Sequence, residues 1–305
     1  MALNLIFMGT PEFALTILDT LDKSEHNVLC VYTQSPKKSN RGQKINKSPV
    51  HLFSEKKKIN LRYPANLDEV EINFIKKLDP DVVVVAAYGK IIPEKFLKFK
   101  DIMFINVHAS LLPKWRGAAP IQRSIIEMDK ETGISIMKIV SKLDAGPYLM
   151  QEKILIDKND NYLSLSKKLS KLGSQLIIKS LNQIEKKNFY LTNQDENSVT
   201  YAKKINKNES EIKWNLPSSK LIAKINGLNP FPGAWFKHKG TRLKIIQAVE
   251  VNQSGAEGEI LDDNLTIGCK NNAIRILAIQ KEGKKILSTK NFLSGYKIFK
   301  GEKIH

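Results

Sequence analysis

The sequence predicts an α/β protein, with an open, mostly parallel sheet followed by a small second domain of short β-strands. Short apolar segments alternate with helical segments over the first 189 residues, as expected for strands joined by right-handed crossovers. Residues 81–87 contain four consecutive valines, a composition typical of a strand buried on both faces of a parallel sheet. After residue 233, strand-like segments follow one another at close spacing, which favours a small barrel.

Apolar spacing and breaker residues place the elements of the first domain. Thr10 is predicted to be the N-cap of the first helix, with Pro11 at its first helical position. The basic, polar stretch 34–48 has no hydrophobic period and is predicted to be a loop. The predicted elements are a strand at 3–7, a helix at 12–21, a strand at 26–32, helices at 49–57 and 67–77, strands at 81–87 and 102–107, a helix at 120–128, a strand at 133–140 and a helix at 162–187.

A polar, Asn-rich stretch separates the two predicted domains. We expect an α/β domain over residues 1–189, a linker over 190–207 and a β-barrel domain over 208–305. A hairpin turn is expected at 237–240, where Lys-His-Lys-Gly interrupts the apolar pattern. The predicted strands of the second domain lie at 234–236, 243–251, 258–261, 265–269 and 273–279.

Composition and charge limit the classes of partner. The chain has 305 residues and a net charge of +18, which makes a polyanion a natural partner. An excess of lysine over arginine also fits a compositional bias, so charge alone leaves both explanations open. The strongest apolar run, 82–88, is too short to span a bilayer, and the N-terminus lacks the basic region of a signal peptide. We therefore expect a cytoplasmic protein with no membrane partner.

No metal site is expected from the cysteines and histidines. Cys30 and Cys269 lie far apart in apolar stretches and have no CxxC or histidine companion. This predicts two buried, reduced thiols rather than a disulfide or a zinc site. Four of the five histidines likewise have no companion in the sequence and are predicted to lie on the surface: His26, His51, His238 and His305.

The fifth histidine belongs to a group of polar residues that follows the strand at 102–107. Asn106 and His108 are two residues apart and share one face of that strand, near its carboxyl end, where open parallel sheets bind ligands. Asp144 lies on the loop after the strand predicted at 133–140, and in a parallel sheet that loop can open on the same edge. The three groups suit transfer at a carbonyl carbon, because the amide can stabilise an oxyanion, the imidazole can move a proton and the carboxylate can orient the imidazole.

Together with their neighbours, these residues resemble the folate-dependent formyltransferases over nearly the whole chain. The Asn106, His108 and Asp144 set identifies the reaction. The segment 115–122 and the basic C-terminal domain are most similar to the members of the family that act on tRNA. The matching blocks are 7–14, 106–122, 143–147, 201–205, 212–214, 229–234 and 283–285.

The resemblance implies a Rossmann-like catalytic domain and an OB-like C-terminal domain that binds tRNA. It implies that the formyl group of 10-formyltetrahydrofolate is transferred to the α-amino group of initiator methionyl-tRNA, without a metal, and nothing demands more than a monomer. It assigns catalysis to Asn106, His108 and Asp144. The remaining implied contacts are Ser110, Leu111, Leu112, Pro113, Tyr88 and Gly89 for the folate, and Arg41 and Lys44 for the tRNA.

Two other functions stay open. The same chemistry could act on a small acceptor, either a purine-nucleotide amine or a nucleotide-linked amino sugar, but such an acceptor needs neither the extra β domain nor the charge of +18. A non-catalytic RNA-binding protein could retain an enzyme scaffold, but it would not need an intact set of Asn106, His108 and Asp144.

Overall fold

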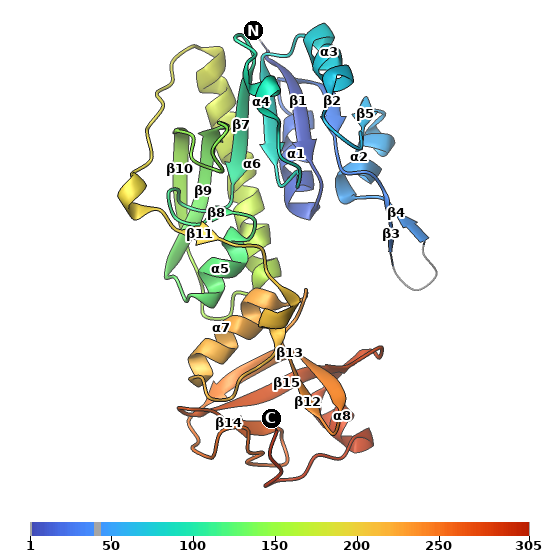
Figure 1. Cartoon of the computed structure of the whole chain (residues 1–305), viewed down its shortest axis with the longest axis vertical. Helices are drawn as coiled ribbons and strands as arrows, with labels where there is room; N and C mark the ends of the chain where they lie inside the picture. The colour runs from blue at the N-terminus through green and yellow to red at the C-terminus, as the bar shows by residue number, and fades with distance from the viewer. Residues whose placement is uncertain (1, 40–43, 305) are drawn as a thin grey trace. The chain divides into compact units, whose positions relative to one another are not determined.

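The computed structural model describes residues 2–39 and 44–304. The chain forms two compact units, which Figure 1 shows with their elements labelled. The first unit comprises residues 1–117, 131–154 and 166–201, and the second comprises 118–130, 155–165 and 202–305. The second unit therefore contains the helix that the sequence places at 120–128 in the first domain, and the predicted division at 189 and 207 remains a prediction.

The first unit is built on a seven-stranded sheet in the order β10-β9-β7-β6-β1-β2-β5. The pairs of β1 with β2 and β6, of β2 with β5 and of β6 with β7 are all parallel, which confirms the predicted α/β class. β9 runs antiparallel to β7. The bounds are β1 (Asn4–Gly9), β2 (Asn27–Tyr32), β5 (Leu61–Arg62), β6 (Val82–Ala86), β7 (Met103–His108), β9 (Glu131–Lys138) and β10 (Tyr148–Leu155).

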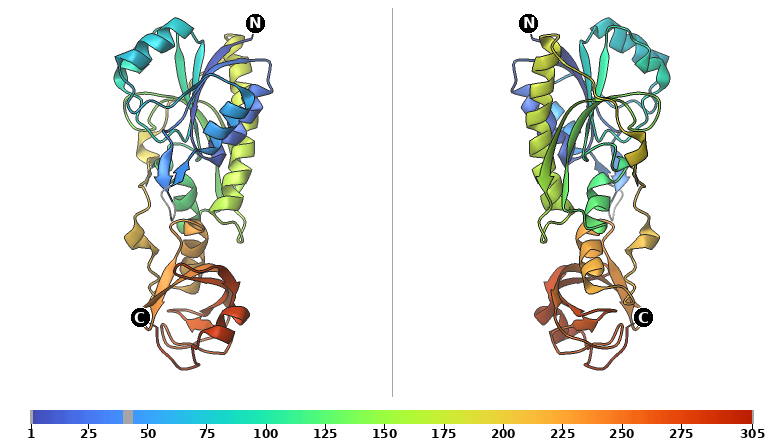
Figure 2. Two further views of the ribbon diagram at one scale, coloured as in Figure 1. Left: turned by 90° about the vertical axis from the view of Figure 1, so that its right-hand side faces the viewer. Right: turned by 90° about the vertical axis from the view of Figure 1, so that its left-hand side faces the viewer.

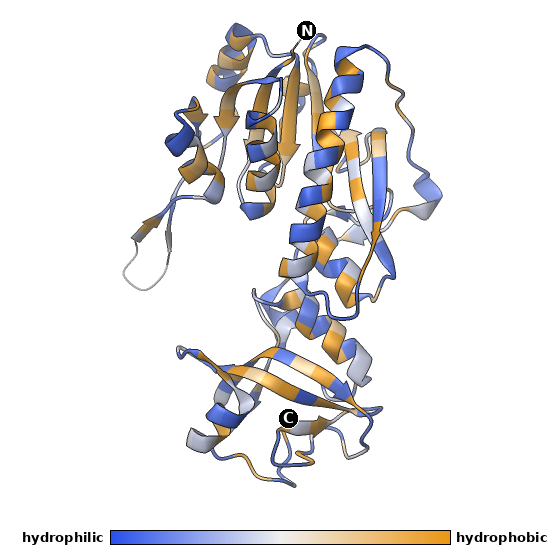
Figure 3. Cartoon of the chain, turned by 180° about the vertical axis from the view of Figure 1, so that it is seen from behind, coloured by the Kyte–Doolittle hydropathy of each residue, from blue (hydrophilic) through white to orange (hydrophobic). Residues whose placement is uncertain are grey.

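Helices cover both faces of this sheet (Figure 2). Ile72 and Ile75 of α3 (Glu69–Leu78) and Phe96 of α4 (Glu94–Leu97) form one core with Phe104 of β7. On the other face, α6 (Tyr162–Glu185) approaches Val107 of β7 and lies close to α1 (Glu12–Asp22), beside which α2 (Pro49–Lys57) also lies. Figure 3 shows the apolar central strands and the mixed hydropathy of α6, as expected for strands buried on two faces and a helix buried on one.

The start of α1 differs in detail from its prediction. Pro11 stands at the N-cap, and no side chain caps the helix. The hydroxyl of Thr10 instead donates to the carbonyl oxygen of Tyr88 at 3.0 Å. Thr10 therefore joins the loops after β1 and β6 rather than starting the helix.

The stretch predicted to be a loop at 34–48 contains two short strands. β3 (Lys37–Ser39) and β4 (Lys44–Asn46) pair antiparallel, in the register Lys37 with Asn46. The sequence did not reveal these strands, because three residues are too few to show an alternating pattern of side chains. Residues 40–43 lie outside the described part of the chain.

The second unit contains a curled antiparallel sheet in the order β12-β13-β15-β14, with β16 also paired to β15. β13 bends at register shifts between Ile245 and Ala248, as bulged strands do. The hairpin turn predicted at 237–240 joins β12 to β13, and its two central residues, Lys239 and Gly240, both have positive φ, 47° and 74°, as a two-residue hairpin requires. The bounds are β12 (Trp235–His238), β13 (Thr241–Val251), β14 (Thr266–Gly268), β15 (Ala273–Lys281) and β16 (Ile286–Ser288).

Three helices and several bridges complete this unit. The predicted strand at 258–261 forms only isolated bridges, at Glu259 and Ile260. α5 packs closely on α7, because a Cβ on Gly227 would lie 2.7 Å from Cγ1 of Ile126. The helices are α5 (Pro120–Ile126), α7 (Ser218–Leu228) and α8 (Thr289–Gly295); the remaining short elements of the chain are β8 (Arg116–Gly117), β11 (Tyr201–Ala202) and the 3-10 turns Glu196–Ser198 and Lys207–Ser210.

The two cysteines are free and buried, as predicted. Burial raises the pKa of Cys30 to about 12 and that of Cys269 to about 11, so both remain thiols at neutral pH. None of the helices in the described part of the chain has the length and apolarity needed to cross a membrane.

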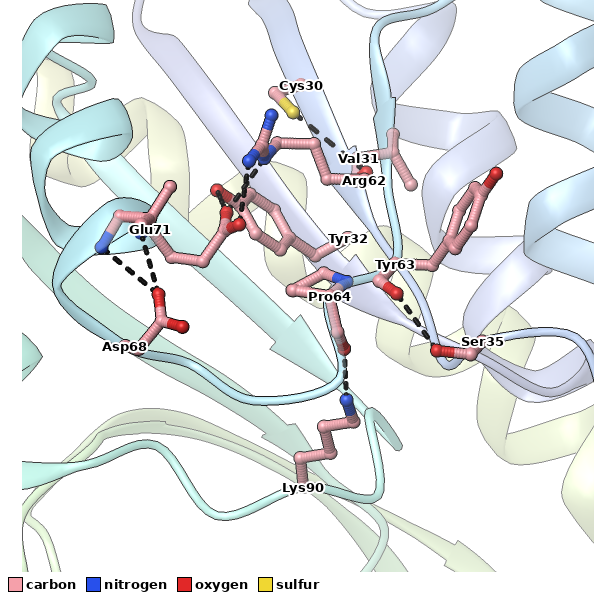
Figure 4. Close-up of polar contacts among 11 residues, drawn as sticks. Cys30, Val31, Tyr32, Ser35, Arg62, Tyr63, Pro64, Asp68, Glu71 and Lys90 are labelled. Carbon is pink, nitrogen blue, oxygen red and sulfur yellow. Dashed lines mark hydrogen bonds and ion pairs between the residues drawn. The ribbon is translucent and has the colours of Figure 1, made fainter.

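A buried ion pair braces the β2–β5 edge of the sheet against α3. The Glu71 carboxylate accepts hydrogen bonds from Nε and Nη2 of Arg62, at 2.7 and 2.6 Å, and from the Tyr32 hydroxyl at 2.8 Å (Figure 4). The Arg62 guanidinium also lies 4.0 Å from the centre of the Phe74 ring. The carboxylate thus has three donors in place of the water that its burial removes.

Candidate active site

β7 positions two of the three residues that the sequence predicts to be catalytic. Phe104, Asn106 and His108 share the face that α3 and α4 cover, because side chains alternate along a strand and Phe104 belongs to that core. Asn106 is half-buried, and among the described residues its side-chain amide has no hydrogen-bond partner. The amide N–H groups are therefore available to a bound molecule.

His108 has an oxygen atom beside each ring nitrogen. Its side chain is 6 % exposed. Nε2 lies 3.0 Å from the carbonyl oxygen of Trp115, and because a carbonyl can only accept, Nε2 carries a proton in this contact. Nδ1 lies 3.7 Å from Oδ2 of Asp144, which is too long for a direct hydrogen bond but close enough for an ion pair.

Asp144 reaches His108 by a different route from the one predicted. β9 runs antiparallel to β7, with His108 opposite Ser135, so the chain leaves β9 beside Phe104 rather than beside His108. The loop after β9 then returns toward His108, and Oδ2 of Asp144 accepts a hydrogen bond from the Gly117 amide at 2.8 Å. The three predicted residues do come together. The prediction that β9 runs parallel to β7 and so carries Asp144 to this edge is wrong.

The segment after His108 is a tight turn held by its own polar groups. The Ser110 hydroxyl donates to the carbonyl oxygen of Lys114 at 2.6 Å, and the Lys114 amide donates to the Leu111 carbonyl at 3.0 Å. Ser110 and Leu112 are buried, whereas Leu111 and Pro113 are half-buried. Of the four residues predicted to line a folate site, Leu111 and Pro113 thus present side-chain surface, while Ser110 and Leu112 support the turn.

Sequence reasoning missed two residues that support this turn. The Ser135 hydroxyl donates to the Ser110 carbonyl at 2.7 Å and accepts from the Leu112 amide at 3.0 Å. Nε2 of Gln151 donates to the Leu112 carbonyl at 2.7 Å and to the Ser135 hydroxyl at 2.8 Å. The one available signal was a serine between two isoleucines of β9, since a buried hydroxyl needs partners.

Tyr88 and Gly89 lie in the loop after β6, where three segments meet. The Tyr88 carbonyl accepts from the Thr10 hydroxyl and from Nε2 of Gln34, both at 3.0 Å. Gly89 has φ 77°, and a Cβ there would lie 2.2 Å from Nε2 of Gln34. The loop therefore requires glycine at this position. Burial raises the pKa of Tyr88 to about 12, so its phenol, which is inside the core, stays protonated.

The predicted tRNA contacts cannot be placed as side chains. Arg41 lies outside the described residues, and Lys44 begins β4 with its side chain outside them as well. In the described part of the chain no group of three His, Cys, Asp or Glu side chains is arranged to hold a metal ion. A surface cleft of about 750 Å³ in the second unit contains none of the predicted site residues; its lining includes Arg123, Glu127, Glu209, Lys213, Lys224 and Leu228.

The prediction that the other histidines lie on the surface is wrong for three of them. His26, His51 and His238 are buried, and each has a polar partner far from β7: Asn182, Glu55 and Glu302 respectively. Asn182 and Glu302 come from distant segments, so the local sequence could not reveal them. Glu55 lies four residues after His51 on the same helix, a spacing that does bring two side chains together. His305 lies outside the described residues.

Gly146 allows the Asp144 loop to pass close to β9, so Gly146→Ala should displace that loop. A Cβ at this position would lie 1.8 Å from the Lys138 carbonyl oxygen, which belongs to the backbone and has little freedom to move. We expect the catalytic rate constant to fall about 10- to 100-fold as Asp144 shifts relative to His108. Gly295→Ala is the matched control, because its Cβ would meet nothing within 4 Å. Steady-state rates and melting temperatures check this, and an active Gly146→Ala protein would contradict it.

Comparison with known proteins agrees with this arrangement. The formyl transferase family model matches residues 3–181, and the model of the formyl transferase C-terminal domain matches residues 204–297. The methionyl-tRNA formyltransferase of Pelagibacter ubique is 48 % identical, covering 100 % of this chain and 99 % of that one. The corresponding protein of Paramagnetospirillum magneticum is 42 % identical, covering 98 % and 99 %.

Solved structures share the fold at low identity. An N-formyltransferase from Helicobacter canadensis, in complex with folinic acid and dTDP-3-aminofucose, matches with a TM-score of 0.70 and 20 % identity, covering 92 % of this chain and 100 % of that one. HypX from Aquifex aeolicus, in complex with tetrahydrofolic acid, matches with a TM-score of 0.69 and 15 % identity, covering 96 % of this chain and 47 % of that one. From the family models and the full-length relatives, the chain belongs to the formyl transferase family, among its methionyl-tRNA formyltransferases.

Proposed function

We propose that this protein transfers the formyl group of 10-formyltetrahydrofolate to the α-amino group of initiator methionyl-tRNA, giving N-formylmethionyl-tRNA and tetrahydrofolate. The observation that carries the proposal is the convergence of an unpartnered amide, a buried imidazole and a carboxylate, on Asn106, His108 and Asp144, within one face of the sheet. The 48 % identity to a methionyl-tRNA formyltransferase supports tRNA as the acceptor over a small amine.

In the first step, the neutral α-amine attacks the formyl carbon, and the carbonyl oxygen takes up the electron pair. The Asn106 amide donates to this oxyanion, and the His108 ring does so once one of its N–H groups turns to the substrate from the Trp115 carbonyl or from Asp144. Each such donor contributes about 3 kcal/mol to stabilising the transition state. The buried position of His108 strengthens its donation, because little water competes for the charge.

In the second step, the attacking nitrogen loses its proton and the leaving nitrogen of the folate gains one as the carbon–nitrogen bond breaks. Asp144 stands 3.7 Å from Nδ1 of His108 and holds the Gly117 amide with the same oxygen. It can therefore orient the ring and pass the proton through a water molecule. No covalent enzyme intermediate is needed.

The folate is proposed to bind between the turn after β7 and the loop after β6. Leu111 and Pro113 offer apolar surface, and the backbone of 85–91, around Tyr88 and Gly89, offers hydrogen-bonding groups to a pterin ring. The complex of HypX with tetrahydrofolic acid supports a folate on this fold. We further propose that Arg41 and Lys44 contact the tRNA, which the net charge of +18 favours, and that the protein acts as a cytoplasmic monomer.

The decisive assay measures formyl transfer from 10-formyltetrahydrofolate to four acceptors: initiator methionyl-tRNA, elongator methionyl-tRNA, glycinamide ribonucleotide and a nucleotide-linked amino sugar. We expect transfer to initiator methionyl-tRNA alone. Transfer to either small amine, with none to tRNA, would replace the acceptor but keep the chemistry. An RNA complex without transfer to any acceptor would indicate a binding protein instead.

A further inference from the structure

A short segment of the first unit, residues 194–200, contacts both the turn after β7 and the loop that contains Asp144. We call it the clasp. Oε1 of Gln194 accepts from Nε of Arg116 at 2.9 Å, and its Nε2 donates to the carbonyl oxygens of Asp144 and Gly146, at 2.9 and 2.7 Å. Exchanging the two ends of the amide would set donor against donor and acceptor against acceptor, so its orientation is determined by its partners.

Arg116 extends this connection through the protein interior. Its side chain is fully buried, and Nη2 donates to Oε1 of Glu196 at 2.7 Å, while Oε2 of Glu196 accepts from Lys142 at 2.7 Å. Hydrogen bonds from Arg116 and Lys142 lower the pKa of Glu196 to about 2, so the clasp is charged at neutral pH. The segment predicted to be a linker is thus bonded to the turn that contains Arg116 and to the loop that contains Lys142.

The turn that contains Arg116 contacts both His108 and Asp144, and the loop that contains Lys142 carries Asp144 itself. The Trp115 carbonyl accepts a hydrogen bond from Nε2 of His108, and the Gly117 amide donates to Asp144, so Arg116 lies between the two contacts. Thr200 adds two bonds, because its hydroxyl accepts from the Trp115 amide and its carbonyl from the Arg116 amide, both at 2.9 Å.

The backbone at both places is in an unfavourable conformation. Trp115 has φ 63° and Asp144 has φ 45°, values in the left-handed region, which is unfavourable for residues with a Cβ. Such conformations persist where surrounding contacts maintain them. The clasp supplies side-chain contacts to both.

We propose that Gln194 is a positioning residue for the formyl transfer, which ties the loop of Asp144 to the turn of Trp115 and Gly117 and so maintains the separation of Asp144 from His108. The inference rests on the proposed function for its kinetic consequence. Its structural consequence, the environment of the His108 ring, can be measured without any substrate.

The first experiment compares Gln194→Ala with Asn193→Ala, an exposed neighbour without a hydrogen bond to the described residues. We expect kcat to fall about 10- to 100-fold in Gln194→Ala, with the KM values for tRNA and folate within twofold of wild type. Asn193→Ala should behave as wild type. An unchanged kcat, or a lower melting temperature with unchanged kcat per folded molecule, would show a merely structural role and overturn the proposal.

A second variant separates the two sides of the Gln194 amide. In Gln194→Glu, one carboxylate oxygen can still accept from Arg116, but the other faces the carbonyl oxygens of Asp144 and Gly146 and cannot donate to them. We expect kcat to fall at least as far as in Gln194→Ala. A wild-type rate in Gln194→Glu would mean that only the Arg116 contact matters and would refute the tie to the Asp144 loop.

The substrate-free measurement uses protein with ¹⁵N-labelled histidine. The resonances of His108 are identified by their loss in His108→Ala. In Gln194→Ala the His108 ring nitrogens should shift, whereas in Asn193→Ala they should not. Unchanged resonances would overturn the positioning role. A wild-type protein that formylates none of the four acceptors, but whose His108 resonances respond to Gln194→Ala, would remove the proposed function and leave the clasp intact.

Discussion

His108→Ala should lower kcat for formyl transfer by about 10³-fold, because the ring both donates to the oxyanion and takes part in proton movement. The substitution leaves a half-buried carboxylate at Asp144, but the Gly117 amide still bonds it, so the fold should persist. Single-turnover rates with saturating folate and tRNA measure the effect. His51→Ala is the matched control, since it also removes a buried histidine, from α2.

Two companion substitutions test the division of roles within the site. Asn106→Ala should cost about 10²- to 10³-fold in kcat, as expected for one oxyanion donor. Asp144→Asn keeps the size of the side chain but removes the charge opposite Nδ1 of His108. Its loss in rate should overlap with that of His108→Ala, so the double variant should be little slower than His108→Ala alone. A folded His108→Ala protein with a wild-type rate would exclude the site.

Glu71→Ala should lower the free energy of unfolding by about 3 kcal/mol, the low end of the cost of breaking a buried ion pair. The low end applies because the Arg62 side chain is 28 % exposed and can partly rehydrate, whereas that of Glu71 is 6 % exposed. The buried Tyr32 hydroxyl, drawn beside Glu71 in Figure 4, also loses its acceptor. Urea or guanidinium unfolding followed by circular dichroism measures the change.

A neighbouring glutamate on the same helix provides the control for this measurement. Glu69 pairs with Lys95 on the surface at 2.5 Å, with both side chains more than half exposed. Glu69→Ala should therefore change the unfolding free energy by less than about 1 kcal/mol. Equal losses in the two variants would contradict a special role for the buried pair.

The same carboxylate makes stability depend on pH. Burial opposes ionisation of Glu71, but hydrogen bonds from Arg62 and Tyr32 outweigh it and hold the pKa of the carboxyl below its usual value of 4.5. A lowered folded-state pKa adds stability that is complete above the unfolded pKa and is lost as the pH falls through the folded value. The stability difference between wild type and Glu71→Gln should thus shrink below about pH 4.5. A difference that is constant from pH 7 to pH 3 would contradict this.

The strands of the sheet could be predicted well, because each is a short apolar run bounded by polar or turn-forming residues. The four valines of β6 identify a two-sided buried strand, and α2 has the predicted bounds, 49–57. The direction of β9 could not be predicted in this way. An apolar strand of eight residues has the same pattern whether its neighbour runs parallel or antiparallel.

The predicted catalytic residues could be found from the sequence, whereas the residues that hold them in place could not. Asn106 and His108 are two residues apart on one strand, so the strand period alone puts them on one face. Ser135, Gln151 and Gln194 act through contacts that join distant parts of the chain, and a single polar residue in a strand or a polar stretch carries no spacing signal. The 194–200 segment has the composition of a linker, and only the tertiary structure shows its bonds.

The groups that contact the catalytic pair most closely from the turn after β7 are the Trp115 carbonyl and the Gly117 amide, both part of the peptide backbone. Replacement of the Trp115 side chain leaves its carbonyl in place, so a mutational scan at this position does not report on the contact with His108. Gly117 has φ 122°, where a Cβ strains the backbone, so a substitution there would also disturb the amide that bonds Asp144. Replacing the Gly117 amide by an ester through protein semisynthesis removes the N–H alone. The contacts of the turn with His108 and Asp144 thus depend on its backbone conformation, not on the chemistry of a single side chain.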